Sequence, residues 1–253
     1  THDELETCVS RAYTQEKFGP EPVLLKSLAG VGNRHILELW HGPTCAFKDM
    51  ALQILPYFLS IAQKKNTSGR KAVILVATSG DTGKAALEGF RDVPDTRVVV
   101  FYPQNGVSPM QKKQMISQEG KNVNVCAIHG NFDDAQTAVK HIFTDEQTKL
   151  VLKENGMMFS SANSINWGRL LPQIVYYFYA YFRLSETGKV ELGQPINIVV
   201  PTGNFGNILA AYYASQMGLP VNRFICASNT NKVLTDFIHT GIYDRRRKFY
   251  TTS

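Results

Sequence analysis

A buried strand, a glycine-rich turn and an alanine-rich helix follow one another in Val199-Val200-Pro201-Thr202-Gly203-Asn204-Phe205-Gly206-Asn207-Ile208-Leu209-Ala210-Ala211. The glycines let the backbone approach a ligand closely, and the helix start directs unpaired N–H groups and its positive dipole end at that ligand. A strand-to-helix turn without a ligand is the alternative, but the Asn204 and Asn207 side chains add hydrogen-bond donors. The stretch therefore predicts a phosphate site, although it has neither the dinucleotide-binding spacing nor that of a Walker loop.

The same strand-to-helix rhythm extends over most of the chain from residue 35 onward. Short β-branched runs predict strands over 36–40, 72–77, 98–102, 123–128, 196–200 and 224–227. Longer amphipathic stretches predict helices over 47–65, 82–91, 109–118, 133–153, 167–184, 207–217 and 232–240. This alternation predicts an α/β fold with mainly parallel twisted sheets and helices on both faces. Because ligands in such folds bind at the carboxyl ends of the strands, the strand-to-helix junctions are where chemistry is expected.

The composition argues against several classes of protein. The 253 residues are 43% hydrophobic, which is enough for one large domain or two lobes, and disorder is excluded for most of the length. No run approaches the roughly 20 apolar residues of a membrane span. The longest candidate, 174–182, is too short and contains several tyrosines. A membrane partner is therefore not expected.

The net charge of +6 suggests a nucleic-acid partner, but its distribution does not. Four of the positive charges lie together at 245–248, whereas a nucleic-acid binder usually has a continuous basic stripe with aromatic residues between the charges. The chain has four widely spaced cysteines without a Cys-x-x-Cys pair, and they are Cys8, Cys45, Cys126 and Cys226. We therefore expect no metal site, and we expect mostly buried free thiols in a reducing, cytoplasmic compartment.

A second junction with the same architecture is Val76-Ala77-Thr78-Ser79-Gly80-Asp81-Thr82-Gly83-Lys84-Ala85-Ala86. It is not a P-loop, because the interval before Gly83 is too short and Ala85 stands where a metal-binding hydroxyl would be required. Hydroxyls and backbone donors at a helix start suit a carboxylate instead. A helix that is simply N-capped by Thr78, Ser79 or Asp81 needs no ligand, and the residues alone leave both interpretations open.

A third junction is His41-Gly42-Pro43-Thr44-Cys45-Ala46-Phe47-Lys48-Asp49-Met50-Ala51. The positive dipole end of a helix disfavours a charged lysine at its start, so this position favours the neutral, nucleophilic amine. A surface lysine that extends away from the helix start is the alternative, and this motif alone does not exclude it.

Together, in this chain order, the three junctions resemble pyridoxal-phosphate enzymes of the tryptophan-synthase-β type, also called fold type II. They are most similar to threonine synthases of the longer bacterial and fungal branch, and Asn163-Ser164-Ile165-Asn166-Trp167-Gly168-Arg169 is similar to a fourth block of that family. The resemblance extends from about residue 35 to the end of the chain. It implies pyridoxal 5′-phosphate as the cofactor.

The resemblance assigns roles to individual positions. Lys48 would be the catalytic residue that bonds to the cofactor aldehyde. The other cofactor-binding residues would be Phe47, Asp81, Gly203, Asn204, Phe205, Gly206 and Asn207. Residues facing the substrate would be Ser79, Thr82, Ser160, Ser161, Asn163, Ser164, Asn166 and Arg169. Within this last set, the planar guanidinium of Arg169 is the group best suited to a substrate phosphate.

The implied reaction is that of a carbon–oxygen lyase acting on phosphates, which converts O-phosphohomoserine and water to L-threonine and phosphate in the last step of threonine biosynthesis. The partner would be a small phosphorylated amino acid, and the protein would be a monomer or a homodimer. The alternatives are a related dehydratase or phospho-lyase that yields a 2-oxo acid and ammonia, and an inert fragment that only binds ligand.

The resemblance also implies a domain organisation. Residues 1–46 would begin a large cofactor lobe, 47–161 would form a smaller mobile lobe on the substrate side, and 162–253 would return to the large lobe with the phosphate loop. Threonine synthases of this branch are considerably longer, so we expect a truncated chain. The residue that partners the pyridine nitrogen is expected beyond Ser253.

Overall fold

Alternate side chains of strand β3 (Lys71–Ala77) enter two different hydrophobic cores in the computed structural model. Ala72, Ile74 and Val76 face one core, and Val73 and Leu75 face the other. Successive side chains of a strand point to opposite faces, so a strand that is covered on both faces has a continuous apolar sequence. This double burial explains why the run is uniformly hydrophobic.

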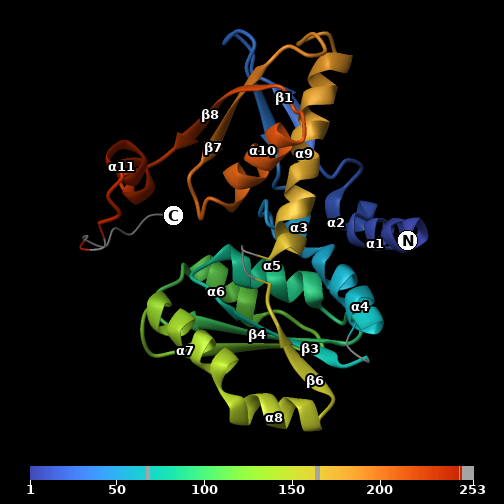
Figure 1. The fold of residues 1–253 in the computed structure, drawn as a ribbon, viewed down its shortest axis with the longest axis vertical. Helices are drawn as coiled ribbons and strands as arrows, with labels where there is room; N and C mark the ends of the chain where they lie inside the picture. The colour runs from blue at the N-terminus through green and yellow to red at the C-terminus, as the bar shows by residue number, and fades with distance from the viewer. Residues whose placement is uncertain (67–68, 163–165, 245, 247–253) are drawn as a thin grey trace. The chain divides into compact units, whose positions relative to one another are not determined.

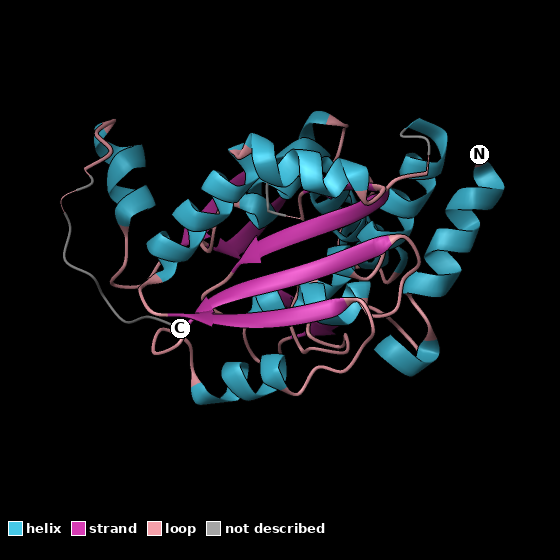
Figure 2. Ribbon diagram, turned by 90° about the horizontal axis from the view of Figure 1, so that it is seen from below, coloured by secondary structure: helices cyan, strands magenta, loops and turns pink. Residues whose placement is uncertain are grey.

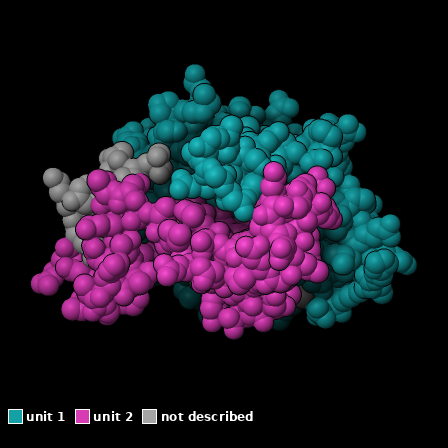
Figure 3. Space-filling model, turned by 90° about the horizontal axis from the view of Figure 1, so that it is seen from above, with its two compact units in different colours: residues 1–172 teal, residues 173–253 magenta. Residues whose placement is uncertain are grey.

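The structure describes residues 1–66, 69–162, 166–244 and 246, in two units that Figure 3 distinguishes by colour. Unit 1 is Thr1–Pro172 and unit 2 is Gln173–Ser253. The predicted α/β class with mainly parallel sheets and two lobes is confirmed. The more detailed division into 1–46, 47–161 and 162–253, with a mobile middle part, stays a prediction.

Unit 1 is built on a parallel sheet with the strand order β5-β4-β3-β6 (Figure 1). The strands beside β3 are β4 (Thr96–Pro103), β5 (Val123–Ile128) and β6 (Met157–Ser160). A separate antiparallel pair is formed by β1 (Leu24–Ser27) and β2 (His35–Glu38). The helices are α1 (His2–Ala12), α2 (Gln15–Phe18), α3 (Asp49–Leu52), α4 (Leu55–Asn66), α5 (Asp81–Phe90), α6 (Pro109–Ile116), α7 (Phe132–Thr144), α8 (Glu146–Glu154) and the start of α9 (Trp167–Glu186).

Helices cover both faces of this sheet, as Figure 2 shows for the strands that run side by side. Apolar side chains of α3, α4, α5 and α6 pack on one face, where Leu87, Phe90 and Met115 are fully buried. Side chains of α7 and α8 pack on the other face with Val139 among them. The carboxyl ends of β3 and β6 therefore lie at one edge, between two layers of helices.

Helix α5 approaches α3 at a glycine. A Cβ atom on Gly89 would lie 2.1 Å from the carbonyl oxygen of Leu52, a distance that no side chain tolerates. Because glycine has no Cβ, the two helix backbones pack in direct contact. This contact fixes the end of α3 against the last turn of α5, and both helices begin at junctions that the sequence singles out.

Two predicted helices are wrong in extent. The helix expected over 47–65 is two helices, α3 and α4, because Pro56 lacks the N–H that a continuous helix would donate to the carbonyl oxygen of Leu52. The helix expected over 133–153 is also two, α7 and α8. The Asp145 side chain accepts a hydrogen bond from Thr148 N at 2.7 Å and so starts a new helix where the apolar pattern runs on.

Some elements were not predicted at all, namely α1, α2, β1 and β6. β6 is a short strand at the edge of the sheet with only partly buried side chains, so it lacks the apolar run of β3. The expectation of mostly buried thiols is also wrong. All four cysteines are free, but only Cys8 is buried, whereas Cys45 is exposed.

Unit 2 contains the rest of α9 and a parallel pair of strands, β7 (Ile196–Pro201) and β8 (Val221–Ala227). Helix α10 (Gly206–Gln216) connects these strands, and α11 (Val233–Thr240) follows β8. Ala210, Ala211 and Ala214 of α10 are fully buried, which explains the small residues that the sequence places there. In the described parts of both units, no helix combines the length and apolar character that a membrane crossing requires.

Candidate functional site

The Lys48 side chain reaches the start of α5. Its Nζ lies 2.5 Å from Asp81 Oδ1, and the lysine side chain is 15% exposed whereas that of Asp81 is 45% exposed. Nζ also lies 5.5 Å from the centre of the Phe47 ring. Three residues predicted from two separate motifs are thus brought together. They hold a partly buried amine beside a carboxylate and an aromatic ring.

A buried carboxylate, Asp49, fixes the loop that carries Lys48. Its oxygens accept hydrogen bonds from Thr44 N at 2.8 Å and from the Thr44 hydroxyl at 2.7 Å. A Cβ on Gly42 would lie 2.5 Å from Asp49 Cβ, so only glycine lets the loop close over the carboxylate. Burial raises the pKa of Asp49 above its ordinary value, and the hydrogen bonds from Thr44 oppose this effect. The His41–Asp49 motif therefore positions its lysine through a structural aspartate.

The turn before α5 is organised by Thr78, which is buried. Its hydroxyl oxygen accepts hydrogen bonds from Gly80 N at 3.1 Å and Gly83 N at 3.0 Å, and the hydroxyl donates to Gly80 O. Thr78 thereby caps one N–H of the first turn of α5, that of Gly83. The N–H groups before it have no partner within the helix, so this start suits a carboxylate ligand. Ser79 is exposed and Thr82 half-buried at the same turn.

Arg169, near the start of α9, is only 5% exposed. Its Nη1 donates to Ala162 O at 3.0 Å. Burial lowers the pKa of the guanidinium to about 10, and the negative charge of Asp81 opposes this effect. Unit 1 thus collects Lys48, Asp81 and Arg169 at the carboxyl edge of its sheet.

The remaining predicted substrate residues that the structure describes lie at the end of β6 and at the start of α9. Ser160 ends β6 and Ser161 follows it, both half-buried at the same sheet edge. The Asn166 side chain donates to Ser161 O at 2.5 Å and accepts from Gly168 N at 2.8 Å, so it fixes the start of α9. Asn163 and Ser164 lie outside the described residues.

Unit 2 holds the glycine–asparagine turn. Gly203 and Phe205 have positive φ angles of 45° and 63°, and Phe205 caps α10 without a side-chain hydrogen bond. Thr202 anchors the start of the turn, because its N–H and its hydroxyl both donate to Ala227 O, at 2.8 and 2.7 Å. The N–H groups of the first turn of α10 have no partner within the helix. These N–H groups could donate hydrogen bonds to the oxygens of a phosphate group.

Two tyrosines of α9 hold the other end of this turn. Tyr176 Oη donates to Asn207 Oδ1 at 2.9 Å, and Tyr177 Oη donates to Asn207 O at 3.1 Å and contacts Oδ1 as well. Sequence reasoning missed both residues. The tyrosines stood out in the 174–182 run, but their hydroxyls could not be matched to an acceptor about 30 residues away.

Gln111 of α6 was also missed. Its side-chain amide lies over Gly80, where an added Cβ would be 2.8 Å from Gln111 Nε2. This amide therefore borders the turn before α5. No pattern in the sequence links it to that turn, because α6 and the turn meet only through packing.

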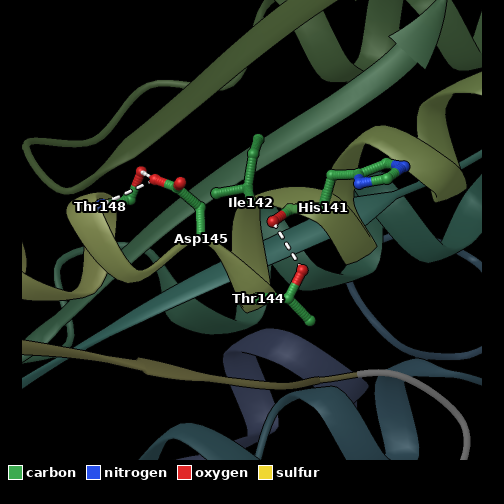
Figure 4. Close-up of a pocket in the computed structure, with 5 residues that line it drawn as sticks. All are labelled: His141, Ile142, Thr144, Asp145 and Thr148. Carbon is green, nitrogen blue, oxygen red and sulfur yellow. Dashed lines mark hydrogen bonds between the residues drawn. The ribbon is translucent and has the colours of Figure 1, made fainter.

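A surface hollow of about 400 Å³ lies elsewhere, at the junction of α7 and α8 (Figure 4). Several of its polar groups bond to one another: Asp145 caps α8 through Thr148, and the Thr144 hydroxyl donates to His141 O at 3.0 Å. None of the predicted site residues lines it. Nor do the described residues contain a group of three or more His, Cys, Asp or Glu side chains that could hold a metal ion.

Comparison with known proteins gives a consistent result. A family model described as "Pyridoxal-phosphate dependent enzyme" matches residues 23–252. The chain is 47% identical over 250 residues to "Threonine synthase-like 1" of Macaca fascicularis and 43% identical over 251 residues to threonine synthase of Eremothecium gossypii. Among solved structures, the PLP-bound threonine synthase of Brucella melitensis aligns with a TM-score of 0.83 at 38% identity.

These matches cover nearly all of this chain but only part of each relative. The two sequence matches include 96% of the chain, and they include 32% of the Macaca protein and 47% of the Eremothecium protein. The structural match includes 99% of the chain and 51% of the Brucella chain. The chain thus spans between a third and a half of the length of these relatives.

Proposed function

The chain belongs to the family of pyridoxal-phosphate dependent enzymes, and from this premise we propose that its function is the conversion of O-phosphohomoserine and water to L-threonine and phosphate. The observation that carries the proposal is the partly buried Lys48 amine held beside Asp81. Threonine synthases of fungi and bacteria among the relatives support this choice of reaction.

Pyridoxal phosphate is the cofactor of this family, and the described residues include groups suited to its aldehyde and to its phosphate. The Lys48 amine suits the aldehyde, because an amine is the nucleophile that joins to a carbonyl carbon. Phe47 and Asp81 flank that amine. The uncapped start of α10, with the 203–207 turn before it, suits the phosphate group.

When bound, the cofactor supplies an electron sink that stabilises negative charge on substrate carbon atoms. In our proposal, the Lys48 amine takes the proton from the substrate Cα and then moves protons at Cβ as general base and acid. The start of α5, with Ser79 and Thr82, binds the substrate carboxylate. Phosphate leaves from Cγ and water adds at Cβ.

We assign the substrate phosphate to Arg169. A guanidinium is planar and donates two parallel hydrogen bonds to phosphate oxygens, which a lysine cannot reproduce. The Ala162 carbonyl oxygen accepts a hydrogen bond from Nη1 at 3.0 Å and so helps to orient the guanidinium. Ser160 and Ser161, at the end of β6, are the proposed supporting hydroxyls. A cytoplasmic location and a monomeric or homodimeric state stay predictions.

The test is product analysis. The purified protein is loaded with pyridoxal phosphate and given O-phosphohomoserine, and threonine, phosphate and 2-oxobutanoate are measured. We expect threonine and phosphate in equal amounts, and no product from Lys48→Ala. Formation of 2-oxobutanoate without threonine would replace the proposal with a phospho-lyase. Uptake of the cofactor without turnover of this substrate would reduce the function to ligand binding.

A further inference from the structure

The side chain of Asn207 receives more support than a turn residue needs. Two tyrosine hydroxyls converge on Asn207 Oδ1, and one of them also donates to the main-chain oxygen of the same residue. Gln173 is a second acceptor for Tyr176, at the longer distance of 3.3 Å. An α-helix needs no such contact with its second residue, so the convergence requires a reason beyond secondary structure.

We propose that Tyr176 and Tyr177 are positioning residues that orient the Asn207 amide and the start of α10 for the cofactor phosphate. The proposal rests on the assignment of that phosphate to the 203–207 turn. Neither tyrosine is predicted to touch the ligand. Both act through Asn207, which is the second residue of α10 and whose side-chain oxygen accepts from both hydroxyls.

The donor inventory of asparagine explains how this works. The side chain has one carbonyl oxygen with two lone pairs and one NH₂ group with two protons. Both hydroxyls bond to the side-chain oxygen, and Tyr177 shares its single proton between this oxygen and Asn207 O, so the oxygen faces the tyrosines and the NH₂ group stays available as a donor. Among the described residues, that NH₂ group has no hydrogen-bond acceptor. An anion at the start of α10 supplies one.

Burial makes the two hydroxyls reliable donors. Tyr176 is 2% exposed and Tyr177 is 7% exposed. This burial raises the pKa of both phenols, so each hydroxyl keeps its proton in the neutral pH range. Buried hydroxyls without a partner are costly, so the tyrosines and Asn207 hold each other in place. The support is therefore rigid and independent of pH in the neutral range.

The other end of the turn is anchored by different means. Thr202 bonds to the end of β8 through its main chain and its hydroxyl, and the hydrogen bonds of the described residues do not join it to either tyrosine. Loss of a tyrosine hydroxyl should therefore leave the entrance of the turn in place and release only the Asn207 side. This separation lets an experiment address the tyrosines alone.

The experiment compares pyridoxal phosphate with pyridoxal, which has the same aldehyde and ring but no phosphate. Dissociation constants for both are measured by absorbance and fluorescence titration in the wild-type protein, Tyr176→Phe and Tyr177→Phe. Tyr179→Phe is the matched control, because Tyr179 lies on the same helix but has no side-chain hydrogen bond among the described residues. Circular dichroism and thermal unfolding confirm that each variant is folded.

We expect each of the two phenylalanine variants to bind pyridoxal phosphate about tenfold more weakly, the effect of one misplaced charge-assisted hydrogen bond. Pyridoxal should bind as it does to the wild-type protein, and Tyr179→Phe should leave both constants unchanged. Asn207→Asp keeps the acceptors for the tyrosines but replaces the NH₂ group with negative charge. It should lose more than tenfold in pyridoxal phosphate affinity while it retains pyridoxal.

Equal losses for the two ligands, or no loss for either, would overturn the proposal, because a merely structural role does not select for the phosphate. If Tyr177→Phe does not fold, Asn207→Asp and Tyr176→Phe carry the same comparison. Binding of inorganic phosphate, followed by its ³¹P resonance, gives a further measurement that does not depend on the aldehyde. If the wild-type protein binds neither pyridoxal phosphate nor inorganic phosphate, the proposal is also overturned. A wild-type protein that binds the cofactor but forms no threonine would remove the proposed reaction and leave this inference standing.

Discussion

Gly89 of α5 lies so close to Leu52 of α3 that a Cβ atom at position 89 would be 2.1 Å from the Leu52 carbonyl oxygen. The obstacle is a main-chain atom, so it cannot move aside as a flexible side chain would. The contact joins the end of α3 to the last turn of α5, whereas Lys48 and Asp81 face each other at 2.5 Å from the starts of the same two helices. A glycine that touches neither side chain thus helps to set the relative positions of the two helices that carry them.

Gly89→Ala should therefore destabilise the protein, although alanine favours helix more than glycine. Overpacking costs about 1–3 kcal/mol, whereas the gain in helix propensity is at most about 1 kcal/mol. We expect a net loss of about 1–2 kcal/mol in the free energy of unfolding, measured with urea, and weaker bonding of pyridoxal phosphate to Lys48. Gly89→Val should lose more. An alanine variant as stable as the wild type would show that the helices separate without cost.

Lys48→Ala should abolish the covalent attachment of the cofactor. Reduction with borohydride followed by peptide mass spectrometry should find the pyridoxyl group on residue 48 of the wild-type protein and on no residue of the variant. Loss of the nucleophile and base should lower kcat by at least about 10²–10⁴-fold. Lys113→Ala, which changes an exposed lysine of α6, should retain the label at position 48. A label that persists on another lysine in Lys48→Ala would assign the chemistry elsewhere.

Arg169→Lys should weaken the binding of the phosphorylated substrate. Lysine keeps the charge but loses the bidentate geometry, so we expect KM for O-phosphohomoserine to rise about 10–100-fold with a smaller change in kcat. Because burial lowers the pKa of Arg169 to about 10, the wild-type KM should also rise as the pH approaches that value. Arg97→Lys is the control, since Arg97 is exposed and bonds only to the main chain of Lys121. An unchanged KM in Arg169→Lys would exclude the proposed phosphate contact.

Asp49→Asn should destabilise the protein and change its dependence on pH. The amide loses one of the acceptors that hold Thr44, at a cost of about 1–3 kcal/mol. Burial raises the pKa of Asp49 in the folded protein above the ordinary 3.8, so the folded state binds its proton more tightly than the unfolded state. The contribution of Asp49 to stability therefore falls as the pH rises from 3.8 through the folded pKa, and the variant should lack this decline.

Asp145→Asn provides a control of opposite sign for Asp49→Asn. Hydrogen bonds from Thr148 lower the pKa of Asp145, so its contribution to stability is present at neutral pH and is lost as the pH falls through the folded pKa. Asparagine also caps helices well and should preserve the start of α8. The free energy of unfolding is measured between pH 3 and pH 8 for the wild-type protein and both variants. Relative to the wild type, the two substitutions should change the slope of this free energy against pH in opposite directions. Slopes of the same sign would contradict the assignment of Asp49.

The sequence predicts best those features that depend on neighbouring residues. The β3 run and the glycine–asparagine turn are evident because burial on two faces and a tight turn restrict local composition. Helix boundaries are harder to predict where local signals compete. The apolar periodicity continues through Pro56 and Asp145, but each of these residues separates two helices. The residue types of Lys48 and Asp81 were predicted, but their contact was not, because it follows from helix packing at Gly89.

Long-range polar partners were the least predictable part of the candidate site. Tyr176 and Tyr177 stood out only as polar residues in an apolar run, and Asp49 had the ordinary position of an acid at a helix start. Their roles depend on single hydrogen bonds to Asn207 and Thr44. Hydrophobic patterns constrain which face of a helix is buried, but they do not encode which buried hydroxyl meets which oxygen.

The uncapped start of α10 has a consequence for the stability of the protein. In our proposal the cofactor phosphate binds at that position and serves as the missing cap, so binding of the cofactor and folding of unit 2 would reinforce each other. Cofactor at a hundred times its dissociation constant adds about 2.7 kcal/mol to stability, a large share of what a typical domain possesses. Under our proposal, the cofactor-free protein would therefore open more often at the start of α10, and an added protease would cleave it faster than the loaded protein.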